Sequence, residues 1–116
     1  MRLWLGIAAV NGALAVAAGA SAAHVLRVHL APEMLSAWDT GARYHMVGAL
    51  AMGLAALAGS RWSPALFLAG MLLFSGSLYA LALGAPAWLG PVTPFGGCFL
   101  IAGFICLAIS SFSKPS

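Results

Sequence analysis

The sequence is poor in charged residues, and this shortage decides its broad class. Only 6% of its 116 residues are charged, and the two acidic ones are Glu33 and Asp39. A soluble domain carries roughly a quarter charged residues, so this chain lacks the polar surface that a soluble fold needs. Disordered chains are poor in apolar residues, whereas 63% of this chain is hydrophobic. The composition therefore indicates an integral membrane protein.

Basic residues and cysteines are also scarce. The five basic residues are Arg2, Arg27, Arg43, Arg61 and Lys114. They form no cluster of four or more, so the sequence predicts neither a nucleic-acid partner nor a polybasic lipid-binding segment. Cys98 and Cys106 are eight residues apart in one apolar run. That spacing is a helical rise of about 12 Å, too long for a disulfide, and we interpret both as packing residues.

Long apolar runs fill most of the chain and predict four transmembrane helices. At roughly 20 residues per span, four spans use about 80 residues and leave only short connections. The spans are expected at about 3–23, 40–58, 64–84 and 93–112, with one substantial outer-side loop at 24–39. Within this loop, Pro32 is placed to begin a short interfacial helix. The expected fold is a single all-α domain, an integral membrane bundle of four transmembrane helices over residues 1–116.

The first span has a second interpretation. Arg2, the apolar run and the small residues Ala20-Ser21-Ala22 also resemble a secretory signal with a cleavage site. The core of such a signal has roughly 7–15 residues, and this run is longer. We therefore expect the first span to be retained.

The basic residues predict the orientation. With four spans, both termini lie on the same side, together with the connection between spans two and three. That side holds Arg2, Arg61 and Lys114 and no acidic residue, whereas Arg27 and Arg43 share the other side with both acids. The positive-inside rule therefore places both termini in the cytoplasm. The expected location is the bacterial plasma (inner) membrane.

Tryptophans support these boundaries. Trp4 and Trp62 fall at one predicted membrane surface, and Trp38 and Trp88 fall at the other. Amphipathic rings of this kind are typical of both membrane interfaces.

Small residues recur at four-residue spacing within the spans. The stripes are Ala15, Gly19 and Ala23; Ala49 and Gly53; and Gly76, Ala80 and Gly84. Small residues let helices approach closely, which drives their association in lipid. Packing inside the bundle is the favoured interpretation, and an outward stripe for a partner protein is the alternative.

Polar residues gather toward the predicted outer side. The candidate cluster comprises His24, Trp38, Asp39, Arg43, Tyr44, His45, Ser75, Ser77, Tyr79 and Thr93. Lipid cannot satisfy polar groups at membrane depth, so they usually face the bundle interior or a cavity. The sequence thus predicts a one-ended polar cluster that is a candidate ligand-binding site.

Known catalytic and metal-binding patterns are absent from this cluster. No histidine pair has the i, i+4 or HExxH spacing of a recognisable ligand set, so neither metal nor cofactor is expected. Ser75 and Ser77 lack the GxSxG pattern of a nucleophile elbow. Neither acid lies inside a predicted span, which disfavours proton-coupled transport.

Arg43 is the one charge placed within a span. Asp39 is its partner candidate at i, i+4. We expect Arg43 to face the bundle near His24, and its replacement by Ala to destabilise the protein more than replacement of Arg27.

Four segments resemble one known family. They are AAGASAAHVL, WDTGARYHM, LFSGSLYALAL and LGPVTPFGG, in this order along nearly the whole chain. They are similar to the small four-span membrane proteins of unknown function that include YgdD-like and transmembrane protein 256-like proteins, the DUF four-two-three family. The resemblance implies a four-helix membrane protein without established activity or catalytic residues. The motif residues are His24, Trp38, Tyr44, Ser75, Gly76, Ser77, Tyr79, Thr93, Pro94, Gly96 and Gly97.

This chain departs from the family pattern in the second span. The family has a histidine before an Ala-Leu-Ala run, where this chain has Gly48. His45 lies three residues earlier on the same helical face and is placed to substitute for it.

These observations favour a non-enzymatic membrane protein. The expected role is an accessory, assembly or interaction component whose partners are the lipid bilayer and another membrane protein or a homo-oligomer. The alternative is a carrier or binder of a small molecule or lipid at the polar cluster. A weaker third hypothesis is an enzyme or haem protein that uses His24 and His45.

Overall fold

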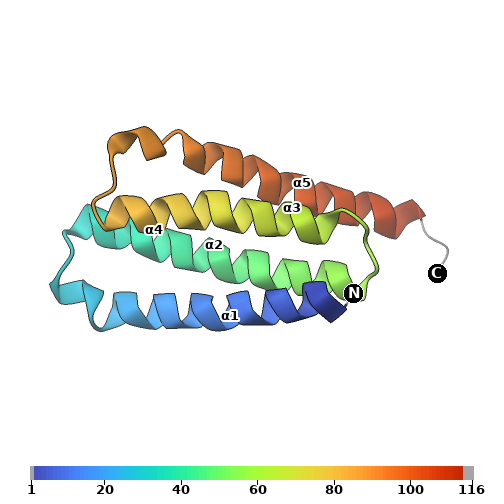
Figure 1. Cartoon of the computed structure of the whole chain (residues 1–116), viewed down its shortest axis with the longest axis horizontal. Coiled ribbons are helices and arrows are strands. Elements are labelled where there is room, and N and C mark those ends of the chain that lie inside the picture. The colour runs from blue at the N-terminus through green and yellow to red at the C-terminus, as the bar shows by residue number, and fades with distance from the viewer. Residues whose placement is uncertain (1, 114–116) are drawn as a thin grey trace.

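Four long helical rods lie side by side in the computed structural model, which describes residues 2–113 (Figure 1). They are α1 (Arg2–Ala23), α2 (Pro32–Leu57), a third rod and α5 (Val92–Ser113). The third rod runs without interruption through α3 (Ser63–Gly70), the π-helical turn η2 (Met71–Ser75) and α4 (Gly76–Ala82). The connections hold two short 3-10 turns, η1 (Leu26–Val28) and η3 (Ala87–Leu89). The expected all-α bundle is confirmed.

The two ends of the bundle differ in which connections they carry. α1 begins and α5 ends at the same end, which also holds the connection 58–62, and we call it the terminal end (Figure 1). The connections 24–31 and 83–91 lie at the opposite end, which we call the loop end. Lys114, which the predicted orientation also uses, lies outside the described residues.

Three rods are long and apolar enough to cross a membrane. These stretches are Arg2–Val28, Ser63–Ala82 and Ala87–Ser113. α2 has 26 residues, about 39 Å of helix, but carries more polar side chains. It lies between α1 and the third rod and contacts both, and nine of its residues are buried. Its charged side chains, Glu33, Asp39 and Arg43, are exposed in its first half, toward the loop end.

The predicted loop over 24–39 is shorter in the structure. α2 begins at Pro32, with Pro at the first helical position and Ala31 extended before it. The indole Nε1–H of Trp38 donates to the carbonyl of Ala18 at 2.8 Å, which holds the first turns of α2 against α1. Residues 32–39 are therefore part of the long helix and not a separate interfacial helix.

Glycine ends two of the rods. Gly59 follows α2 with φ 73°, and Gly84 follows α4 with φ 100°. In each case the glycine N–H and the next N–H return to carbonyls of the last helical turn, as in a Schellman motif. Only glycine adopts these φ values without strain, so the local sequence determines where the chain reverses direction after each helix.

The core lies where α2, the third rod and α5 meet. Met52 and Phe67 are fully buried there, with Met71 and Leu100 beside them. Against α2, α1 buries only Ala8, Ala15 and Ala22, one residue in every seven. This seven-residue period keeps one alanine edge against its neighbour along the whole helix.

The small-residue stripes have mixed roles. Ala15 and Ala49 are buried, and a Cβ on Gly53 would lie 3.8 Å from Ala8, so these stripes pack α1 against α2. Gly76 is exposed, and a Cβ there would meet nothing within 4 Å. Internal packing is therefore confirmed at Ala15, Ala49 and Gly53. It is wrong at Gly19 and Gly76, where a Cβ would meet nothing within 4 Å, and at Ala23, which is exposed.

Candidate functional site

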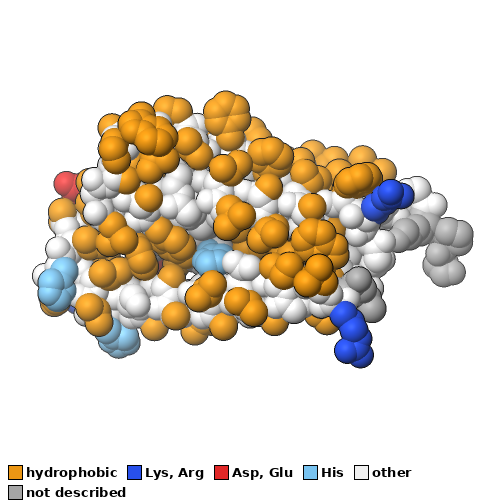
Figure 2. All heavy atoms as spheres, viewed as in Figure 1, with side chains coloured by type: hydrophobic (Ala, Val, Ile, Leu, Met, Phe, Trp, Pro, Cys, Tyr) orange, Lys and Arg blue, Asp and Glu red, His pale blue; other side chains and the backbone are white. Residues whose placement is uncertain are grey.

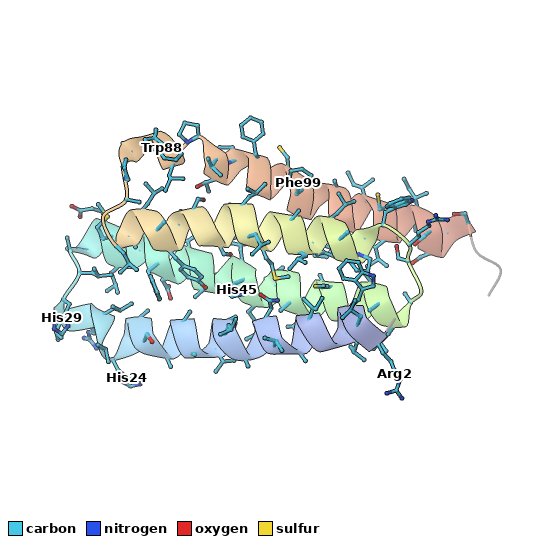
Figure 3. All side chains as sticks on the ribbon, in the orientation of Figure 1. Arg2, His24, His29, His45, Trp88 and Phe99 are labelled. Carbon is cyan, nitrogen blue, oxygen red and sulfur yellow. The ribbon has the colours of Figure 1, made fainter. Side chains whose placement is uncertain are left out.

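A buried histidine at the middle of α2 joins three helices. The Nδ1 of His45 lies 3.0 Å from the hydroxyl of Tyr79 on α4, and its Nε2 lies 2.9 Å from Oδ1 of Asn11 on α1. His45 is 8% exposed. Figure 3 shows His45 pointing between the rods, near the middle of the bundle's length. We call Asn11, His45 and Tyr79, together with Trp38, the central network.

The direction of each hydrogen bond follows from Asn11. Its amide Nδ2 donates to the carbonyl of Ile7 at 2.9 Å, so its Oδ1 is the acceptor that faces His45. The Nε2 of His45 must then carry the proton and donate, which leaves Nδ1 of the neutral ring as an acceptor. Tyr79 donates its hydroxyl proton to Nδ1. The hydrogen bonds are therefore donated in one direction, from Tyr79 on α4 to His45 on α2 and from His45 to Asn11 on α1.

Trp38 closes the network toward the loop end. Its ring packs against that of Tyr79 with the centroids 4.5 Å apart and the planes tilted by 44°, and its Nε1–H donates to the backbone of α1. The glycine at position 41 makes room for this contact, because a Cβ there would lie 3.1 Å from Cε1 of Tyr79. Trp38 therefore packs inside the bundle, whereas Trp88 is 69% exposed, as expected of a residue at the membrane surface.

Two further polar contacts involve the third rod. The hydroxyls of Ser77 and Thr93 lie 2.5 Å apart and join α4 to α5, and Ser77 also donates to the carbonyl of Phe74. Ser75 is 1% exposed and lies at the end of the π turn. Its Oγ is the one buried side-chain polar atom without a partner among residues 2–113.

The charged members of the predicted cluster face outward. Arg43 lies 3.6 Å from Asp39, as expected, but their side chains are 67% and 58% exposed. Arg43 therefore does not turn into the bundle, and that prediction is wrong. The ring of Tyr44 is 41% exposed and meets Phe74 edge-on at 5.0 Å. An ion pair such as Arg43–Asp39, at i, i+4 on a helix surface, stabilises the helix by only about 0.3–0.5 kcal/mol.

His24 is also separate from the network. It is exposed at the end of α1, and Figure 3 shows His24 and His29 pointing away from the bundle at the loop end. The three histidines thus do not converge. No group of three or more metal-ligating side chains occurs within residues 2–113.

Asn11 is the member that the sequence-based cluster missed. It is the only strongly polar side chain within the apolar run of α1, and that was the available signal. Asn11 lies far along α1 from the loop end, and the apolarity of one span does not show which helix its side chain meets. The rotation of α1 against α2 brings it to His45.

The arrangement links three helices through side-chain hydrogen bonds. Within the central network, each described hydrogen-bonding side chain has a protein partner. Fully satisfied polar networks make a core rigid and specific.

Comparison with known proteins places the chain in a family. A family described as "Protein of unknown function (DUF423)" matches residues 18–97. The chain belongs to the DUF423 family. The resemblance inferred from the motifs is thereby confirmed, and the matched region includes every member of the central network except Asn11.

Relatives of this DUF423 chain are described as membrane proteins. A UPF0382 membrane protein of Haemophilus influenzae is 42% identical over 97% of this chain and 96% of the relative. UPF0382 membrane protein YwdK of Bacillus subtilis is 34% identical over 96% and 97%. A UPF0382 membrane protein of Schizosaccharomyces pombe is 34% identical over 94% and 100%. No solved structure matches the chain significantly. With its apolar helices, this DUF423 chain is a membrane protein of a family without known function.

Proposed function

We propose that this DUF423 protein is a non-enzymatic accessory or assembly component of the bacterial inner membrane. It associates laterally, through the outer face of α1, with a transmembrane helix of another membrane protein or of a second copy of itself.

The contrast between two outer helix faces carries this proposal. Small residues at spacings of three and four form an exposed face along α1: Gly6, Ala9, Ala13, Ala17 and Ala20. The exposed residues of α5 include Phe95, Ile101, Ile105, Ile109 and Phe112. Large side chains fill space against lipid chains, whereas small residues let a second helix approach closely. The face of α1 therefore suits a helix and the face of α5 suits lipid.

A groove beside this face supports the proposal that α1 provides the contact surface. It has a volume of about 500 Å³ between α1 and α2 and is lined by apolar and small residues, among them Ala9, Gly12, Leu50 and Gly53. Side chains of a neighbouring helix can enter such a groove as knobs enter holes.

The closed central network supports a structural role over the alternative of a small-molecule carrier. A binding site offers polar groups that await a ligand, and here His45, Asn11 and Tyr79 bond one another. The same closure supports the absence of enzymatic activity, because a general base needs a free nitrogen or oxygen within reach of a substrate.

Native mass measurement of the protein, extracted gently from its own membrane, tests the association. We expect the wild-type chain at a mass above that of the 11.8 kDa monomer. Ala13→Phe adds a large ring to the exposed face without entering the core, and it should release the monomer. Ala108→Phe makes the same change on the exposed face of α5 and is the matched control.

The outcome separates the two surfaces. Release by Ala13→Phe and retention by Ala108→Phe support α1 as the contact. A wild-type protein that is monomeric in every mild detergent, or equal behaviour of the two variants, contradicts the proposal.

A further inference from the structure

A small pocket at the terminal end shares no residue with the α1 face or with the central network. It has a volume of about 280 Å³ between the connection 58–62 and the last turns of α5. Its walls include Arg61, Trp62, Cys106, Ile109, Ser110 and Ser113.

Arg61 brings a positive charge to this pocket, and residues 2–113 place no acidic side chain beside it. The only acids of the sequence, Glu33 and Asp39, lie in the first half of α2, toward the loop end. Figure 2 shows arginine side chains (blue) at the terminal end of the visible face and an acidic side chain (red) at the opposite end. The guanidinium lies over the ring of Trp62 at 5.1 Å from its centroid. Its planar fork of N–H donors matches the oxygens of a phosphate.

The serine hydroxyls of the pocket offer acceptors. Ser110 donates to the carbonyl of Leu107 at 3.1 Å, with Ser60 Oγ 3.4 Å away, and Ser113 donates to the carbonyl of Ile109. A hydroxyl that donates its proton to its own helix keeps oxygen lone pairs for another donor. A ligand that complements these serines therefore carries O–H groups beside its anionic group.

The pocket also changes from polar to apolar along α5. Ser110 and Ser113 lie nearest the end of the helix, whereas Cys106 lies one turn deeper, with Ile109 between them. Trp62 is 64% exposed beside them, and such a ring suits the membrane interface. A ligand with a polar head at the surface and an apolar tail along α5 matches this gradient.

We propose that this pocket binds one anionic phospholipid with a hydroxyl-bearing headgroup, of the phosphatidylglycerol type. Arg61 binds the phosphodiester, Ser110 and Ser113 accept hydrogen bonds from the glycerol hydroxyls, and an acyl chain lies against Ile109 and Cys106. The inference stands apart from the association through α1, because the two surfaces share no residue.

Lipid competition measured by native mass spectrometry tests this site. The full chain in detergent is titrated separately with phosphatidylglycerol, phosphatidylserine and phosphatidylcholine. We expect the wild-type protein to bind phosphatidylglycerol most tightly. Arg61→Gln should weaken that binding about fivefold, the effect of one cation near an anionic membrane surface. Arg27→Gln, which removes an exposed arginine from the loop end, should leave it unchanged.

Two more variants separate charge from headgroup chemistry. Arg61→Lys retains the charge and should keep the preference for phosphatidylglycerol over phosphatidylcholine. Ser113→Ala should reduce the preference for phosphatidylglycerol over phosphatidylserine. Ser113 bonds only its own helix in the structure, so this change should leave the bundle folded.

Four results would overturn the proposal. Equal affinity for phosphatidylglycerol and phosphatidylcholine would show that the site does not select anionic lipid. Equal effects of Arg61→Gln and Arg27→Gln would show that the lipid does not bind in this pocket. Equal affinity for phosphatidylglycerol and phosphatidylserine would show that the serines do not recognise the glycerol hydroxyls. Displacement of the lipid by inorganic phosphate at millimolar concentration would show a site for the free anion instead.

Discussion

His45 shows how a single polar residue can organise a membrane bundle. Its two ring nitrogens form hydrogen bonds with side chains of α1 and α4, so one side chain restrains how three helices are rotated against one another. Interhelical hydrogen bonds in membrane proteins contribute on average only about 0.6 kcal/mol each. A buried polar group left without a partner costs more, about 1–3 kcal/mol. The network therefore acts mainly by penalising other arrangements of the helices.

The bond between His45 and Tyr79 can be tested by paired substitution. Tyr79→Phe removes the donor to Nδ1, and we expect a loss of about 1 kcal/mol in the free energy of unfolding. In a His45→Leu background the Tyr79 hydroxyl already lacks its partner, so the same change should be neutral or stabilising. Unfolding by titration with a denaturing detergent in mixed micelles gives these free energies.

Tyr44→Phe is the control for this cycle. Its ring is 41% exposed, and loss of the hydroxyl there should change stability by less than about 0.5 kcal/mol. An equal effect of Tyr79→Phe in both backgrounds would show that the hydroxyl does not act through His45.

At the scale of elements, α5 packs directly on the backbone of the π turn η2 through Gly96. A Cβ on Gly96 would lie 2.2 Å from the backbone nitrogen of Phe74 and 2.7 Å from the carbonyl carbon of Leu73. The backbones of α5 and η2 are thus in direct contact, and no side chain fits at position 96. The link between Ser77 and Thr93 lies beside this contact.

Adjacent glycines allow this contact to be tested. Gly96→Ala must push α5 away from η2, and we expect a loss of at least about 1–3 kcal/mol in unfolding free energy. Gly97→Ala places its methyl group 3.7 Å from the ring of Phe74, an ordinary contact, and should be neutral or stabilising because alanine favours helix. Thermal unfolding in the same detergent compares the two. Equal stability of the variants would contradict the close approach.

For the whole molecule, the arrangement of charge is the feature that relates the bundle to its membrane. Arg2 and Arg61 lie at the terminal end, whereas both acids lie toward the loop end together with Arg27 and Arg43. The positive-inside rule then predicts that the terminal end faces the cytoplasm.

Labelling of single cysteines on intact cells tests this orientation. In a chain with Cys98 and Cys106 replaced by alanine, Val28→Cys marks the loop end and Ser113→Cys the terminal end. A membrane-impermeant maleimide should label only the cysteine at position 28, because the other lies in the cytoplasm. Permeabilised cells should label both, and the cysteine-free chain neither. Labelling of position 113 alone would reverse the predicted orientation.

The sequence alone determined the membrane class, the all-α bundle and the family. These properties depend on local sums: the apolarity of each run of about 20 residues and the order of short motifs. It also determined the ends of α2 and α4, because Gly59 and Gly84 supply the positive φ that a reversal needs.

Only the tertiary structure decided which polar side chains meet. Asn11 and His45 are 34 residues apart, and Arg43 lies two residues from His45 yet faces outward. Such contacts depend on the rotation of each helix about its axis, since neighbouring residues on a helix point about 100° apart. That rotation is set by close contacts between helices, at Gly41 against Tyr79 and at Gly96 against η2. No single span contains both partners of these contacts, so the apolarity of one span could not specify them.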